Sequence, residues 1–66
     1  MQLTVNGKKE QLDKEMTILD FIFNKDENPE SLVIEYNGEI VIRETWGKLL
    51  LKENDSLEIL KFVGGG

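Results

Sequence analysis

The sequence predicts an α+β domain in which a mixed sheet of four or five strands packs on one helix. Two Asn-Gly dipeptides, at 6–7 and 37–38, each separate two segments with strand character. Asn-Gly is typical of two-residue hairpin turns because both central residues of such a turn need positive φ. Between these hairpins, the segment that begins at Thr17 has apolar residues at helical spacing. A further strand is predicted over 56–63.

The first hairpin combines a half-buried strand with a polar one. Polar and apolar residues alternate over 2–5, which is typical of a strand with one buried face. The return segment, 8–12, carries two lysines and a glutamate. Charged side chains discourage an exposed strand from pairing with other chains, so we expect 8–12 to lie near an edge of the sheet.

The predicted helix begins at Thr17, whose hydroxyl can accept a hydrogen bond from a free backbone N–H group. Asp20 stands three residues later and resembles the acidic member of a capping box. We expect Leu19 and Phe23 to cover the flanks of a small core, and the helix to end near 24–25. The buried stripe is expected to consist of Ile18, Phe21 and Ile22.

The next segment, 25–30, is predicted to be a loop, because it is too polar for a strand and its proline cannot join a strand ladder. Its acidic residues lack the spacing of a calcium-binding loop, which favours a solvated loop over a cation site. The second predicted hairpin pairs 32–36 with 39–42 and is more apolar than the first. In the turn that follows, Trp46 is expected to fold back onto the core.

The last strand, over 56–63, is predicted to have two different faces. Alternation buries Leu57 and Ile59 and turns Leu60 and Phe62 to the opposite face. An exposed apolar pair immediately before the glycines indicates a docking surface for a partner. The residues expected to dock are Leu60, Phe62 and Val63.

Composition and charge argue against several classes of function. The 66 residues include neither cysteine nor histidine, so the chain has no thiolate nucleophile and lacks the commonest general base and zinc ligand. We therefore expect no catalytic residues and no bound metal. A net charge of −5 disfavours nucleic-acid binding and suits a partner with a basic docking face. No signal-peptide pattern or run of membrane-spanning length occurs, so we expect no membrane association and a cytoplasmic location.

Three glycines, Gly64, Gly65 and Gly66, follow the last strand. Glycine loses more conformational freedom on ordering than any other residue, so this segment has no evident role in stability. It provides a slim backbone that ends in a carboxylate and can enter a channel closed to side chains. We therefore divide the sequence into a domain over 1–63 and a flexible tail over 64–66.

Four stretches of the sequence resemble a known family of proteins. They are Val5-Asn6-Gly7, Thr17-Ile18, 37–46 and 55–59 running to the glycines at 64–66. Together they extend over almost the whole chain, in order and with close to family spacing. On these residues the chain resembles the ubiquitin-like sulfur carriers of the β-grasp fold, most closely the thiamine-biosynthesis sulfur carriers of the ThiS family. Gly65 and Gly66 match the terminal pair of that family, Gly64 is an extra glycine, and Asn54 stands where the family often has glycine.

The resemblance implies a mechanism and a set of partners. An E1-like adenylating enzyme would use ATP to activate the carboxylate of Gly66, because a carboxylate is a poor electrophile until it carries a good leaving group. Sulfur derived from cysteine, through a cysteine desulfurase or similar donor, would displace AMP and leave a thiocarboxylate. The thiocarboxylate would then give its sulfur to thiazole synthase. The carrier itself would bind no cofactor, since the partner uses the ATP.

Other functions share parts of this pattern. The small subunit of molybdopterin synthase also ends in diglycine, although such chains are usually longer. A ubiquitin-like protein modifier shares the adenylated intermediate, and a plain β-grasp interaction domain would keep its affinity after loss of the last two glycines. Arg43 also has two interpretations, a partner contact or a loop charge paired with nearby acids.

Overall fold

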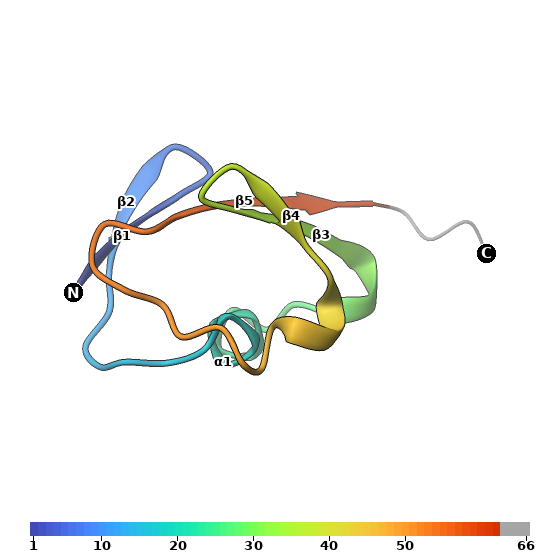
Figure 1. The fold of residues 1–66 in the computed structure, drawn as a ribbon, viewed down its shortest axis with the longest axis horizontal. Helices are drawn as coiled ribbons and strands as arrows, with labels where there is room; N and C mark the ends of the chain where they lie inside the picture. Colours follow the sequence, from blue (N-terminus) through green and yellow to red (C-terminus); the bar gives the residue numbers. More distant parts are fainter. Residues whose placement is uncertain (63–66) are drawn as a thin grey trace.

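The computed structural model describes residues 1–62, in which a five-stranded mixed sheet packs on one α-helix (Figure 1). The strands are β1 (Gln2–Val5), β2 (Lys8–Gln11), β3 (Leu32–Tyr36), β4 (Glu39–Val41) and β5 (Ser56–Lys61). The connections contain the helix α1 (Ile18–Asn24) and two short 3-10 helices, η1 (Pro29–Ser31) and η2 (Arg43–Thr45). The spatial strand order is β2-β1-β5-β3-β4, so the predicted fold class is confirmed.

The last strand of the chain occupies the centre of the sheet. β5 runs parallel to β1 and antiparallel to β3. The predicted extent of this strand, 56–63, is wrong, because β5 ends at Lys61. Lys61 pairs with Leu32, the first residue of β3, so the ladder has no partner strand beyond that point. The Phe62 N–H still donates to the Ser31 carbonyl over 2.9 Å, and Val63 lies outside the described residues.

Both Asn-Gly turns have the left-handed backbone that two-residue hairpins require. The φ angles are 51° at Asn6 and 81° at Gly7, and 51° at Asn37 and 91° at Gly38. Each turn joins two antiparallel strands, β1 to β2 and β3 to β4. Both predicted hairpins are therefore confirmed, and each supplies one edge strand of the sheet.

The helix begins and ends where the sequence predicts. Thr17 is the N-cap, its Oγ1 accepts from the Asp20 N–H, and the Asp20 carboxylate accepts from the Thr17 N–H, which completes the capping box. Leu19 packs against the core, whereas Phe23 is 59% exposed, so the prediction that both cover the core is wrong for Phe23. Phe23 lies one turn beyond Leu19, whose N–H donates to the Trp46 carbonyl. With a helix of seven residues, the described chain contains no helix of the length and apolarity needed to cross a membrane.

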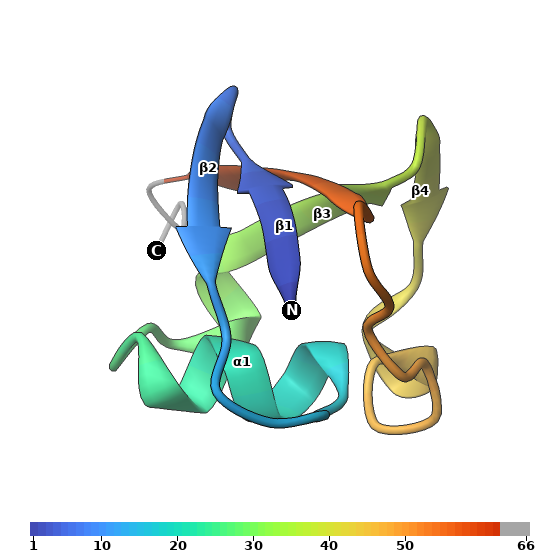
Figure 2. The ribbon, with the colours of Figure 1, turned by 90° about the vertical axis from the view of Figure 1, so that its left-hand side faces the viewer.

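The core lies between one face of the sheet and the helix, as Figure 2 shows. Trp46 is fully buried, as predicted, and its Nε1–H donates to the Val41 carbonyl over 3.1 Å. The segment after Trp46 runs beside α1, since the Ile18 N–H donates to the Leu49 carbonyl. The buried apolar residues are Leu3, Val5, Ile18, Phe21, Ile22, Leu32, Ile34, Trp46, Leu51 and Leu57. Within residues 1–62, no helix packs on the opposite face of the sheet (Figures 1 and 2), which we call the outer face.

Candidate functional site

The strand that leads to the glycines is held from both sides by side chains of the hairpin turns. The Oδ1 atom of Asn6 accepts from the Ile59 N–H over 2.7 Å. From the other hairpin, Asn37 Oδ1 accepts from the Ser56 N–H over 2.8 Å. Each asparagine therefore fulfils two roles, because it adopts positive φ in its turn and also binds β5. As a result, the direction in which β5 leaves the sheet is fixed by bonds at two points along the strand.

A buried carboxylate fixes the residue before β5. Asp55 accepts hydrogen bonds from the Tyr36 hydroxyl, from Asn37 Nδ2 over 3.1 Å and from the Lys52 N–H over 2.8 Å. Burial alone opposes ionisation of Asp55, but these hydrogen bonds outweigh it and lower the pKa of its carboxyl below the ordinary value. Burial and the Asp55 carboxylate raise the pKa of Tyr36 to about 12. The sequence indicates a turn at 54–55, but nothing in its pattern shows that Asp55 is buried.

The predicted docking residues lie partly within the described chain. Leu60 is 57% exposed and Phe62 is 46% exposed. Leu57 is buried and Ile59 packs against the core, so the predicted alternation along β5 is confirmed. Val63 and the three glycines at 64–66 lie outside the described residues, and their predicted roles remain predictions. Leu60 and Phe62 thus form the described part of an apolar surface that borders the glycines.

Two further apolar side chains extend this surface and were missed from the sequence. Ile40 is 68% exposed and Ile42 is 63% exposed, on and just after β4. Val41 between them packs against the core, so alternation places both isoleucines on the outer face. Val33 of β3 pairs directly with Leu60 of β5, and β3 lies between β5 and β4. The alternation at 40–42 is visible in the sequence, but which face is buried depends on the position of α1.

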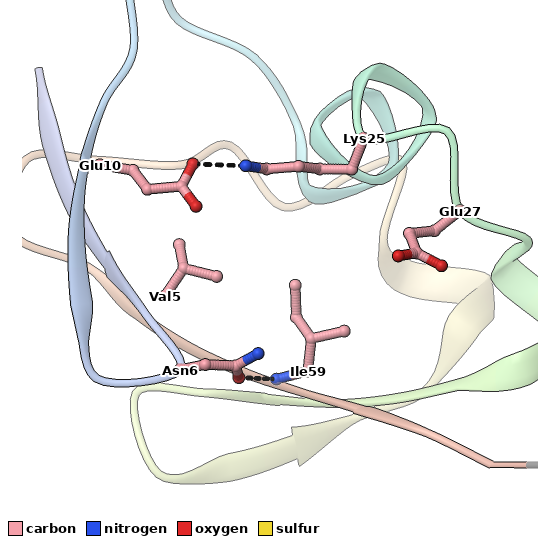
Figure 3. Close-up of a pocket in the computed structure, with 6 residues that line it drawn as sticks. All are labelled: Val5, Asn6, Glu10, Lys25, Glu27 and Ile59. Atoms are coloured by element: carbon pink, nitrogen blue, oxygen red, sulfur yellow. Dashed lines mark hydrogen bonds and ion pairs between the residues drawn. The ribbon is translucent and has the colours of Figure 1, made fainter.

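A small groove on the helix side of the sheet does not have the character of a ligand site (Figure 3). Its volume is about 170 Å³, below the roughly 300 Å³ typical of small-molecule pockets. An ion pair between Lys25 Nζ and Glu10 Oε1, 2.7 Å apart, spans it. Its lining residues are Val5, Asn6, Glu10, Lys25, Glu27 and Ile59. Residues 1–62 also contain no group of three or more acidic side chains arranged to hold a metal ion.

These features define a class of protein. A mixed sheet on one helix, with a central last strand that leads to consecutive glycines, is the architecture of the ubiquitin-like β-grasp carriers. Residues 2–66 match the family model described as ThiS family. The chain therefore belongs to the ThiS family of sulfur carriers, which belong to thiamine biosynthesis. The resemblance stated from the sequence is confirmed.

Individual relatives agree with this assignment. The chain is 34% identical over 65 residues to the sulfur carrier protein ThiS of Bacillus subtilis, covering 97% of this chain and 98% of that one. A crystal structure of the thiamine biosynthesis protein ThiS from Geobacter metallireducens matches all of both chains with a TM-score of 0.85 and 35% identity. A thiazole synthase of Magnetococcus marinus is 30% identical over 66 residues, and the chain spans a fifth of its length.

Proposed function

We propose that this chain carries sulfur as a thiocarboxylate on Gly66 and donates it for thiazole formation. The observation that carries the proposal is the placement of β5, which is held on both sides and leads directly towards the glycines. Gly66 lies four residues beyond Phe62, a distance that an extended chain spans in at most about 14 Å. The folded domain thus supplies a fixed support, and the chemistry takes place within that reach of Phe62.

The chemistry requires partners. In the first step, the Gly66 carboxylate attacks the α-phosphorus of ATP and pyrophosphate leaves, which gives an acyl adenylate. In the second step, a cysteine-derived sulfur nucleophile at the oxidation level of sulfide attacks the acyl carbon and AMP leaves. The chain has no cysteine or histidine to perform either step, so an E1-like adenylating enzyme and a sulfur donor must supply these groups.

Thiazole synthase is the proposed acceptor of the sulfur. Two relatives with that name, from Magnetococcus marinus and Paramagnetospirillum magneticum, contain a region similar to the whole of this chain. Each is about five times longer than the chain, which is consistent with a carrier-like region joined to additional sequence. A carrier and the acceptor with which it reacts are natural candidates for fusion in one polypeptide chain. The family match favours this acceptor over molybdopterin synthase.

Intact mass measurement tests the proposal. The protein is incubated with ATP, an E1-like adenylating enzyme and a cysteine-derived sulfur source. We expect a mass gain equal to the replacement of one oxygen by sulfur. Deletion of Gly66, or Gly65→Trp, should abolish the gain while the melting temperature of the domain stays unchanged. An unmodified mass, with the enzyme shown to be active on another carrier, would contradict the proposal.

A further inference from the structure

The connection between α1 and β3 contacts the end of the last strand at two points. Lys61, the last residue of β5, forms an ion pair with Glu27, with Nζ and Oε1 2.9 Å apart. One residue later, the Phe62 N–H donates to the Ser31 carbonyl over 2.9 Å. Both acceptors lie in a connection for which the sequence predicts only a polar loop over 25–30. This connection therefore supports the end of β5 at the place where its ladder with β3 stops.

The end of the helix holds Glu27 in place. Lys25 is the C-cap of α1, and Asp26 follows it with a φ of 61°. The Asp26 N–H donates to the Phe23 carbonyl over 3.0 Å. The Glu27 N–H donates to the Ile22 carbonyl over 3.3 Å. These two bonds form a Schellman motif, in which a residue with positive φ closes the last turn of a helix, so the backbone of Glu27 is fixed by α1 itself.

The side chain of Glu27 differs from the one typical of this place. The equivalent residue of a Schellman motif frequently makes an apolar contact with the helix. Glu27 instead carries a carboxylate, and Figure 3 shows it at the groove that Ile59 of β5 also lines. The carboxylate adds no apolar contact to the helix end and reaches Lys61 instead. An ion pair with side chains 63% and 33% exposed contributes little to stability, which leaves its position at the end of β5 to be explained.

Lys61 stands in the row of side chains that β5 directs towards the helix. Leu57 is buried in this row and Ile59 packs against the core, so the two-residue period places Lys61 on the same side. The row thus changes from apolar to charged where the core ends. The ion pair ties the last residue of β5 to the end of the helix, and the Phe62 N–H ties the next residue to the start of β3.

We propose that the pair of Glu27 and Lys61 fixes the direction in which the chain leaves the sheet, and that both are positioning residues for adenylation of Gly66. The inference rests on the proposed function, since it takes Gly66 as the group that is activated. An extended chain of four residues spans about 14 Å, so a change of about 20° at Phe62 moves its far end by roughly 5 Å. Displacement of the reacting group lowers the rate of the chemical step and leaves the contacts of the folded domain unchanged.

Single-turnover adenylation tests this role. The rate of pyrophosphate release is measured with ATP and increasing concentrations of the purified E1-like adenylating enzyme. Glu27→Gln and Lys61→Met should each lower the rate constant at saturating enzyme about fivefold, the size expected from loss of one exposed ion pair. The enzyme concentration that gives half of this rate should change less than twofold, because binding of the domain is unaffected.

The matched control is the ion pair between Lys25 and Glu10, whose charged atoms lie 2.7 Å apart. Its side chains are exposed to a similar degree, but neither belongs to β5. Glu10→Gln removes this pair and the same single charge as Glu27→Gln. We expect it to leave the rate constant unchanged. An equal loss in Glu10→Gln would overturn the proposal, because net charge alone would then explain the effect.

Exchange of the two charges distinguishes an internal pair from two separate contacts with the enzyme. Glu27→Lys combined with Lys61→Glu restores an ion pair of reversed polarity and should return the rate constant to within twofold of the wild type. Glu27→Gln combined with Lys61→Met should be no slower than either variant alone. A charge-exchanged variant as slow as the single variants, or losses that multiply in the double variant, would overturn the proposal, because each side chain would then act on the enzyme directly.

NMR relaxation of the free protein provides a readout without the enzyme. The order parameter of the Phe62 amide should fall in Glu27→Gln and recover in the charge-exchanged variant, while Glu27→Gln and Glu10→Gln melt at similar temperatures. An unchanged order parameter would overturn the proposal. If only this inference fails, the wild type and all variants release pyrophosphate at the same rate. If the sulfur-carrier proposal fails, the wild type releases no pyrophosphate at any enzyme concentration, although the order parameter still falls in Glu27→Gln.

Discussion

The two hairpins of the sheet share a turn but differ in their edge strands. Each has an Asn-Gly turn with positive φ at both residues, and each asparagine binds a backbone N–H of β5. The edge strand β2 carries Lys8 and Lys9, which discourages contact with other chains. The edge strand β4 instead exposes Ile40 on the outer face, where Leu60 of β5 is also exposed, with β3 between the two strands. The same turn chemistry therefore supports one protected edge and one edge suited to contact.

The largest effect is expected on the central strand β5, which β3 separates from β4. Leu60→Asp or Phe62→Asp should weaken binding to the adenylating enzyme by about a hundredfold, within the range of 2–4 kcal/mol typical of interface hot spots. Both side chains are exposed, so the melting temperature should change little. Lys9→Asp is the control, since it introduces an acid on β2. Unfolding of both β5 variants would show that these side chains belong to the core.

The two turn asparagines should differ in their effect on stability. Asn37→Ala should lower the free energy of unfolding by about 2–3 kcal/mol, because it removes hydrogen bonds to Ser56 and Asp55 and places alanine at positive φ. Asn6→Ala removes one such bond and should cost about 1–2 kcal/mol. Urea unfolding of both variants measures the difference. An equal cost would show that the additional hydrogen bond from Asn37 to Asp55 adds nothing to stability.

The second hairpin should also be the more sensitive to pH, because its turn contacts Asp55. The pKa of Asp55 is lowered in the folded protein, so its contribution to stability is present above the ordinary value near 4 and is lost as the pH falls through the folded value. The pKa of Tyr36 is raised to about 12, so its contribution is complete below about pH 10 and is lost between pH 10 and 12.

The free energy of unfolding of the wild type and of Asp55→Asn, measured across this pH range, tests both predicted directions of the change in stability. The variant should lose the acid-dependent part of the stability that Asp55 supplies. An unchanged acid limb in the variant would show that other carboxylates produce it. For Tyr36, Tyr36→Phe should abolish the loss of stability between pH 10 and 12, and persistence of that loss would assign it to another group.

The smallest effect on enzyme binding is expected at the edge strand β4. Ile40→Lys or Ile42→Lys places a charge like that of β2 on the contact side and should weaken enzyme binding by about 1 kcal/mol, roughly fivefold, because rim positions contribute less than central ones. Lys8→Gln is the control on the protected edge and should leave Kd unchanged. Binding that is insensitive to both isoleucine variants would restrict the docking surface to β5.

Much of the fold follows from local patterns in the sequence. The Asn-Gly turns, the capping box of Thr17 and Asp20, and the alternation of Leu57, Ile59 and Leu60 are all present as predicted. These features succeed because each depends on φ, on a hydrogen bond three residues away or on the two-residue period of a strand. They require no knowledge of distant residues.

The errors and omissions concern contacts between distant parts of the chain. The end of β5 at Lys61 depends on where β3 begins, and the exposure of Phe23 depends on which segments pack beside α1. The burial of Asp55 depends on Tyr36, which lies 19 residues earlier. The candidate docking residues Leu60 and Phe62 were found because they border the glycines, whereas Ile40 and Ile42 were not.

By itself, the sequence determined the order of elements, the two turns, the helix cap and the family, because each is written in residues close together or in a motif that extends along the chain. Only the tertiary structure decided that Glu27 pairs with Lys61 and that Asn6 and Asn37 both bind β5. Strand register and the choice of buried face are properties of the assembled sheet. They follow from where α1 packs, which no single strand specifies.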